Sequence, residues 1–154
     1  MNPTATKPRF NLGTLAPDVY KALDALDAAA GPDLDGLLKD LIRTHASMIN
    51  GCAFCIDMHT KDAREAGESE LRLYSLPAWR ETPYYSDRER AALAFTEAVT
   101  LVHDGHVSDE AYAGVREHFT EEEVGQLLSV LVSINAWNRI AITARTTPGK
   151  YRPE

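Results

Sequence analysis

The sequence predicts an all-α protein built as a single domain of about six to seven helices. Apolar residues recur at helical spacing through most of the chain, strand-like alternation is absent, and helix-capping residues separate the segments. The length of 154 residues fits one ordinary domain. We expect an extended N-terminal arm over residues 1–13, a helical domain over 14–147 and a C-terminal tail over 148–154.

The first two predicted helices are bounded by residues that start and stop helices. Pro17 is a favoured first helical residue, and the apolar repeat that follows it ends at Gly31. A second apolar stripe begins at Leu34 and is interrupted at His45 before Gly51 stops it. We interpret His45 as a hydrogen-bonded core or interface residue.

The remaining helices follow from capping signals and from one unusually apolar segment. A third helix should begin at the cysteines and cover residues 52–66, with an irregular connection over 77–85 further along the chain. Capping boxes at Ser86 and Thr120 open two later helices, since Glu follows each by three residues. The last helix is apolar on nearly every side over 127–142, which is typical of a helix surrounded by others, at the domain centre or in a subunit interface.

Charge and composition exclude several classes of function. The formal net charge of -7 opposes binding to a phosphate backbone, so no nucleic-acid partner is expected. No secretory signal or membrane anchor is recognised, which favours the cytoplasm and no membrane partner. In that reducing compartment, two nearby cysteines more often indicate redox chemistry or metal binding than a structural disulfide.

The residues that carry chemistry lie at the start of the third predicted helix. Cys52 and Cys55 form a C-x-x-C pair, where unpaired backbone N–H groups and the positive end of the helix dipole favour a thiolate. His59 follows Cys55 by one helical turn on the same face, where it can hydrogen-bond to the sulfur or relay a proton. A dithiol beside a base is typical of a redox centre, in which a thiolate attacks a peroxide and a second thiol completes a disulfide.

Two other interpretations of these residues remain open. The cysteines and the histidine can be small core residues on a buried stripe. C-x-x-C is also half of many zinc sites, which His59, His45 or Asp40 would have to complete. We expect no metal and no cofactor, because adjacent helical positions rarely give a closed tetrahedral shell. From the residues alone, Asp40 is a solvated carboxylate.

Four segments of the chain resemble the alkylhydroperoxidase AhpD-like, or carboxymuconolactone decarboxylase-like, family. They are Ile49-Asn50-Gly51-Cys52-Ala53-Phe54-Cys55-Ile56-Asp57-Met58-His59-Thr60 together with residues 79–83, 86–93 and 134–139. The resemblance implies an AhpD-like helical bundle that assembles as a homo-oligomer, either a trimer or a hexamer built as a trimer of dimers. It also implies a peroxidase that reduces small organic hydroperoxides with its C-x-x-C dithiol and is itself reduced by a thiol carrier.

The resemblance further implies roles for individual residues. Cys55 would be the peroxidatic cysteine, Cys52 the resolving one, and His59 the proton relay. Asp40 lies twelve residues before Cys52, where the family places a carboxylate, although the alkylhydroperoxidase type has Glu there. Phe54 occupies a position that is histidine in some members. The helix dipole alone would favour Cys52 as the more acidic thiol.

The resemblance also leaves two other functions open. A decarboxylase branch of the same superfamily acts on a muconolactone through acid–base residues, which would leave the C-x-x-C pair without a role. A zinc-binding or scaffold oligomer without catalytic activity is the third alternative.

Overall fold

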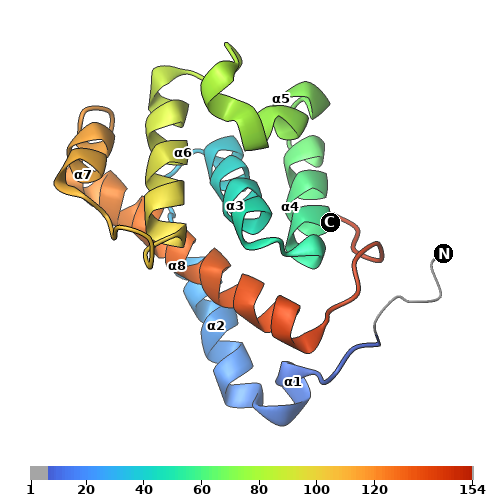
Figure 1. Cartoon of the computed structure of the whole chain (residues 1–154). Coiled ribbons are helices and arrows are strands. Elements are labelled where there is room, and N and C mark those ends of the chain that lie inside the picture. The colour runs from blue at the N-terminus through green and yellow to red at the C-terminus, as the bar shows by residue number, and fades with distance from the viewer. Residues whose placement is uncertain (1–6, 154) are drawn as a thin grey trace.

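The chain folds as a bundle of helices, which confirms the predicted all-α class (Figure 1). The computed structural model describes residues 7–153, so the first six residues of the expected N-terminal arm lie outside the described part. The elements are α1 (Leu12–Leu15), α2 (Pro17–Ala29), α3 (Gly36–Asn50), α4 (Ala53–Glu65), α5 (Glu70–Ser75), the 3₁₀ helix η1 (Leu76–Glu81), α6 (Asp87–Thr100), α7 (Asp109–Arg116) and α8 (Glu121–Ala144). Within residues 7–153 there are eight α-helices, one more than the upper expected number of seven, because a short helix over residues 12–15 begins within the expected arm of residues 1–13.

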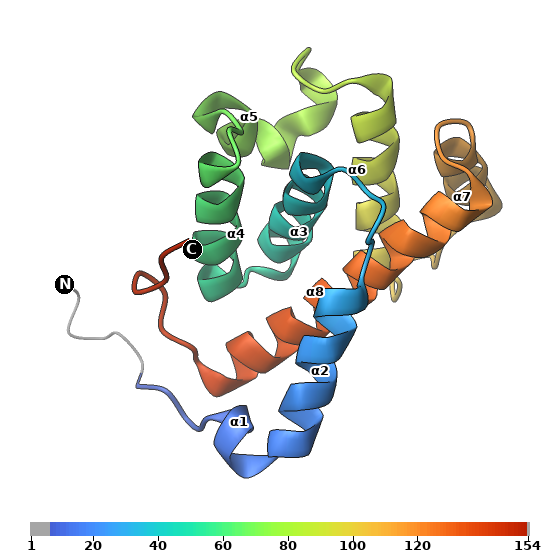
Figure 2. The ribbon, with the colours of Figure 1, turned by 180° about the vertical axis from the view of Figure 1, so that it is seen from behind.

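Helix α8 is the element on which the bundle is assembled. It packs against α2, α3, α4, α6 and α7, and Figure 2 shows it running beneath the upright helices α3, α4 and α6. On length and composition α8 could cross a membrane, but half of its most apolar stretch is buried. The central helix of a bundle has the same two properties.

Helix α3 divides the core into two clusters because adjacent residues on it face opposite sides. Ile42 belongs to a cluster with apolar side chains of α6 and α8. Leu41 belongs to a second cluster with residues from α4, α5, η1 and α6. The fully buried members include Ile42, Leu127, Val130, Leu131 and Ile134 in the first, and Leu41, Leu76 and Leu93 in the second.

Of the segment 77–85 that was expected to be irregular, residues 77–81 belong to the 3₁₀ helix η1, which hydrogen bonds hold in place, and residues 82–85 are irregular. The indole of Trp79 donates to Oε1 of Glu97 at 2.8 Å, and the guanidinium of Arg90 donates to the Trp79 carbonyl at 3.0 Å. The same Glu97 oxygen lies 3.1 Å from Nε2 of His45, a buried side chain whose pKa is lowered by that burial. His45 is therefore a hydrogen-bonded core residue, as predicted.

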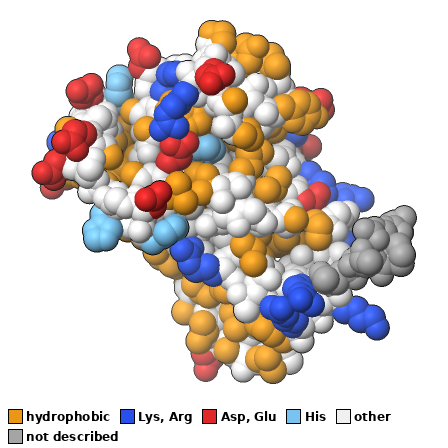
Figure 3. Space-filling view, viewed as in Figure 1, with side chains coloured by type: hydrophobic (Ala, Val, Ile, Leu, Met, Phe, Trp, Pro, Cys, Tyr) orange, Lys and Arg blue, Asp and Glu red, His pale blue; other side chains and the backbone are white. Residues whose placement is uncertain are grey.

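Helices α1 and α2 project from the bundle and bury no residue of their own. Leu15 and Val19 are 69% and 54% exposed, and Figure 3 shows hydrophobic side chains gathered over this lower part of the molecule. Assembly into an oligomer stays a prediction. These exposed apolar residues are relevant to it, because the burial of apolar surface area drives association between protein chains.

Candidate functional site

The C-x-x-C pair is placed by the turn between α3 and α4. Gly51 ends α3 in the left-handed conformation with φ of 68°, and the backbone N–H of Cys52 donates to the carbonyl of Ser47. Cys52 is then the N-cap of α4, and its sulfur accepts a hydrogen bond from the backbone N–H of Cys55 at 3.4 Å. Both cysteines therefore lie in the first turn of the helix, as the sequence predicted.

Asparagines of α8 hold this turn against the core. The side-chain amide of Asn50 donates to Oδ1 of Asn135 at 3.0 Å and to Oδ1 of Asn138 at 2.9 Å. The amide of Asn138 donates in turn to the hydroxyl of Ser47 at 3.1 Å. Because Asn138 is fully buried, these bonds replace the water contacts that its side chain loses on folding. The helical spacing of α8 did not predict that its asparagines hold this turn, because their partner Asn50 lies far away in the sequence.

The structure joins Cys52 and Cys55 in a disulfide. Their Cα atoms are 5.4 Å apart, within the range that a disulfide requires. Each residue is 1% exposed, so the disulfide lies beneath the surface. The two cysteines are therefore placed so that a disulfide bond can form between them.

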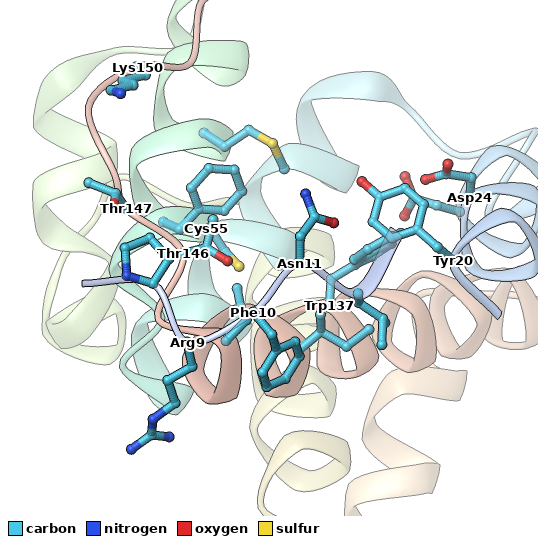
Figure 4. Close-up of a pocket in the computed structure, with 18 of the residues that line it drawn as sticks. Arg9, Phe10, Asn11, Tyr20, Asp24, Cys55, Trp137, Thr146, Thr147 and Lys150 are labelled. Carbon is cyan, nitrogen blue, oxygen red and sulfur yellow. The ribbon is translucent and has the colours of Figure 1, made fainter. Parts of the chain in front are cut away.

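Cys55 lies on the wall of a cavity of about 670 Å³ formed by α2, α4, α8 and both ends of the described chain. Four aromatic side chains line it: Phe10, Tyr20, Phe54 and Trp137. The rings of Tyr20 and Trp137 meet edge to face with centroids 5.1 Å apart. Figure 4 shows this pair at one end of the cavity and Lys150 near the other, with Cys55 between them. A cavity of this kind suits an apolar organic molecule with a few polar groups.

His59 lines the same cavity and is 6% exposed. Burial, followed by the positive charge of Arg43, lowers its pKa to about 4, and the negative charge of Asp27 opposes the shift. Both ring nitrogens are buried, and neither has a hydrogen-bond partner among the described residues. His59 is thus a neutral imidazole at neutral pH. The prediction that Cys55 and His59 share the buried face of α4 is confirmed.

Asp40 lies apart from this group on α3. It does not line the cavity, and within residues 7–153 it forms no ion pair with His59. Partial burial raises the pKa of Asp40 to about 6, Arg43 lowers it and Asp62 raises it. Asp40 is therefore not the solvated carboxylate that its sequence context alone predicted.

Two acidic residues near His59 were missed by the sequence analysis. Oδ2 of Asp62 lies 3.7 Å from Nδ1 of His59, and Asp27 of α2 lines the cavity. The spacing of three residues between His59 and Asp62 is a helical-neighbour signal that could have identified the first. No local signal identifies Asp27, because α2 reaches the site through tertiary contacts, by packing on α8 and by the pairing of Asp27 with Arg43 of α3.

The alternative of a zinc site requires several metal-binding side chains to lie close together. In the part of the chain that the structure describes, no three His, Cys, Asp or Glu side chains are grouped so that they could hold a metal ion.

Comparison with known proteins adds three similarities. Residues 17–98 match the sequence profile of the carboxymuconolactone decarboxylase family. The uncharacterized protein YdfG of Bacillus subtilis (strain 168) is 51% identical over 104 residues, which are 68% of this chain and 71% of that protein. A crystal structure from Agrobacterium tumefaciens, of a protein of unknown function provisionally named an antioxidant defence protein AhpD, superposes with a TM-score of 0.90. It is 38% identical and covers 94% of this chain and 100% of its own.

A second structure supports the fold alone. The alkylhydroperoxidase AhpD core of an uncharacterized peroxidase-related protein from Ralstonia eutropha JMP134 has a TM-score of 0.77 and 22% identity. The match covers 90% of this chain and 74% of that one.

Proposed function

Because the chain belongs to the carboxymuconolactone decarboxylase family, which includes AhpD-like proteins related to peroxidases, we propose that it is a thiol-dependent peroxidase. Its substrates are small organic hydroperoxides, reduced by a cycle between the Cys52–Cys55 dithiol and disulfide. The observation that supports this most is the shared cavity wall of Cys55 and a buried His59 whose nitrogens have no partner among the described residues.

The first half of the cycle oxidises Cys55. Neutral His59 accepts the proton of the Cys55 thiol, and the thiolate attacks the terminal oxygen of the hydroperoxide. A sulfur–oxygen bond forms, the oxygen–oxygen bond breaks, and the alkoxide takes the proton back from His59 and leaves as an alcohol. The Cys52 thiol then attacks the sulfur of Cys55, which closes the disulfide and releases water.

The second half of the cycle restores the dithiol. Two thiols of a carrier reduce the disulfide and become a disulfide themselves, by thiol–disulfide exchange. Asp40 occupies the family's carboxylate position and takes part in this proposal as a member of the proton relay. The proposal also includes a trimeric or hexameric assembly and a cytoplasmic location.

The cavity lining supports an organic substrate over hydrogen peroxide. Phe54 and Trp137 offer apolar area to a hydrocarbon group, which hydrogen peroxide lacks. A hydroperoxide with an aromatic or branched alkyl group would bury that group against these rings while its peroxide end meets Cys55.

The test is oxidation of the reduced protein by cumene hydroperoxide. We expect loss of two thiols per chain, formation of one equivalent of cumyl alcohol, and loss of two hydrogens from the peptide that holds Cys52 and Cys55, detected by mass spectrometry. A Cys55→Ser variant should consume no peroxide beyond the buffer. Equal peroxide consumption by the variant and the wild type would refute the proposal.

The family itself supports a second candidate, decarboxylation of a carboxymuconolactone. The same protein, incubated with that lactone, would release carbon dioxide if this candidate were correct. We expect no release, because the reaction gives no role to the disulfide.

A further inference from the structure

Three carboxylates from three helices are candidates to act on His59, and they differ in what their oxygens contact. Asp27 belongs to α2, Asp40 to α3 and Asp62 to α4. Oδ2 of Asp62 lies 3.7 Å from Nδ1 of the His59 ring. That distance is slightly longer than a hydrogen bond, so a small rotation of either side chain would close it.

The second oxygen of Asp62 is held by the C-terminal tail. The hydroxyl of Tyr151 donates to Oδ1 of Asp62 at 2.6 Å. The tail is itself attached to α4 at two further points, since Gly149 N–H donates to Asp57 at 2.9 Å and Lys61 Nζ donates to the Tyr151 carbonyl at 3.1 Å. Asp62 is therefore oriented, with one oxygen anchored and the other directed toward His59.

The other two carboxylates are placed differently. Oδ1 of Asp27 accepts the hydroxyl of Ser133 at 2.5 Å and lies 3.4 Å from the guanidinium of Arg43. Its charge raises the pKa of His59, but no hydrogen bond joins it to the ring in the described structure. Asp40 is influenced by Arg43 and Asp62 and does not line the cavity.

From this geometry we infer that Asp62, anchored by Tyr151, is a positioning residue that orients His59 for proton transfer at Nε2. An imidazole that gains a proton on one nitrogen is stabilised by an acceptor at the other, which also selects the tautomer. Asp62 would accept the Nδ1 hydrogen and leave Nε2 to exchange the proton of Cys55. The gap in the substrate-free site is consistent with catalytic hydrogen bonds that shorten once charge develops. This inference rests on the peroxidase function proposed above.

The first experiment is the pH dependence of peroxide-driven thiol oxidation in an Asp62→Asn variant. Asn keeps an oxygen for Tyr151 but loses the charge, so we expect a rate about 10- to 100-fold lower with KM nearly unchanged. The acid limb of the profile should move to lower pH, because removal of a negative charge lowers the pKa of His59. Arg43, Asp27 and Asp40 remain in place in this variant, and because Asp62 also raises the pKa of Asp40, an Asp40→Asn variant is measured beside it.

Matched variants separate positioning from structure. Asp62→Glu retains the charge and should restore the position of the acid limb, and Tyr151→Phe should lower the rate by a few fold. Glu65→Gln, an exposed change on the same helix, should leave both rate and profile unaltered. If Asp40→Asn or Asp27→Asn moves the acid limb and Asp62→Asn does not, the inference is wrong.

A second measurement does not depend on activity. The pKa of His59 can be followed by NMR titration of the oxidised protein, in the wild type and in Asp62→Asn. A lower pKa in the variant supports the inference, and an identical pKa overturns it. If the wild type fails to reduce any hydroperoxide, the proposed function is lost, and this titration still decides whether Asp62 acts on His59.

Discussion

The side-chain amide of Asn50 donates a 2.9 Å hydrogen bond to Oδ1 of Asn138, which lies 88 residues further along the chain. This contact joins the last residue of α3 to the middle of α8, and Cys52 follows two residues later. The position of the dithiol is therefore set by a buried polar contact between distant segments as well as by the local turn.

Replacement of Asn138 by Leu should destabilise the protein because it removes the buried hydrogen bonds that Asn138 forms with Asn50 and Ser47, which then keep only their bonds to Asn135 and Arg43. We expect the free energy of unfolding to fall by about 2–4 kcal/mol, measured by urea denaturation. Thr143→Ala, an exposed change on the same helix, should alter it by less than about 0.5 kcal/mol. Equal effects of the two changes would contradict the role of this contact.

Gly31 should not tolerate a side chain. Its φ is +58°, and a Cβ there would lie 2.7 Å from Cγ2 of Val130 on α8. We expect Gly31→Ala to lower the free energy of unfolding by about 1–3 kcal/mol. Gly125→Ala is the matched control, because that helical glycine has open space and Ala should stabilise α8 by about 0.5–1 kcal/mol. Thermal melting of both variants checks the opposite signs.

Asp40 should make stability depend on pH in a defined direction. Its pKa is raised from 3.8 to about 6 on folding, so between these values the folded protein holds a proton that the unfolded chain has lost. The stabilising contribution of protonated Asp40 is complete below the lower value and is lost as the pH rises through the upper one.

Asp40→Asn removes this dependence. The variant should therefore gain thermal stability over the wild type on going from about pH 4 to about pH 8. Melting temperatures at the two pH values, each as variant minus wild type, provide the check. A difference that stays constant would show that the folded environment does not perturb this carboxyl.

Trp137 should determine which hydroperoxides bind. The ring lines the cavity and packs against Tyr20, so Trp137→Ala removes apolar contact from the organic group of a substrate. We expect KM for cumene hydroperoxide to rise about 10-fold, equivalent to about 1.4 kcal/mol of lost contact, while the rate with hydrogen peroxide changes little. A parallel loss with both substrates would show that Trp137 supports the fold rather than selectivity.

Local sequence patterns were sufficient for the longer helices and for the placement of the C-x-x-C pair, although not for α1 or η1. The period of 3.6 residues sets which side chains share a helix face, so Cys55 and His59 were predicted on one face. The capping boxes at Ser86 and Thr120 were likewise predicted and are both formed, since each involves residues only three apart.

Contacts between distant segments of the chain could not be predicted from local sequence patterns. The assignment of Asp40 through family resemblance stays a prediction. Asp62, whose Oδ2 lies 3.7 Å from Nδ1 of His59, was not assigned, and its orientation depends on Tyr151, which is 89 residues further along the chain. The cavity is likewise formed by Phe10 and Lys150 from opposite ends of the described chain.

The sequence by itself determined the longer helices, their caps and the face that carries the dithiol and the imidazole, because hydrogen bonds and side-chain neighbours within a helix span only three or four residues. The tertiary structure alone decided how Tyr151 orients the carboxylate beside His59, how Asn138 holds the turn before Cys52 and what closes the cavity. Those features arise from packing α2, α8 and the tail against α4, and such packing depends on complementarity of whole surfaces, which no local pattern encodes.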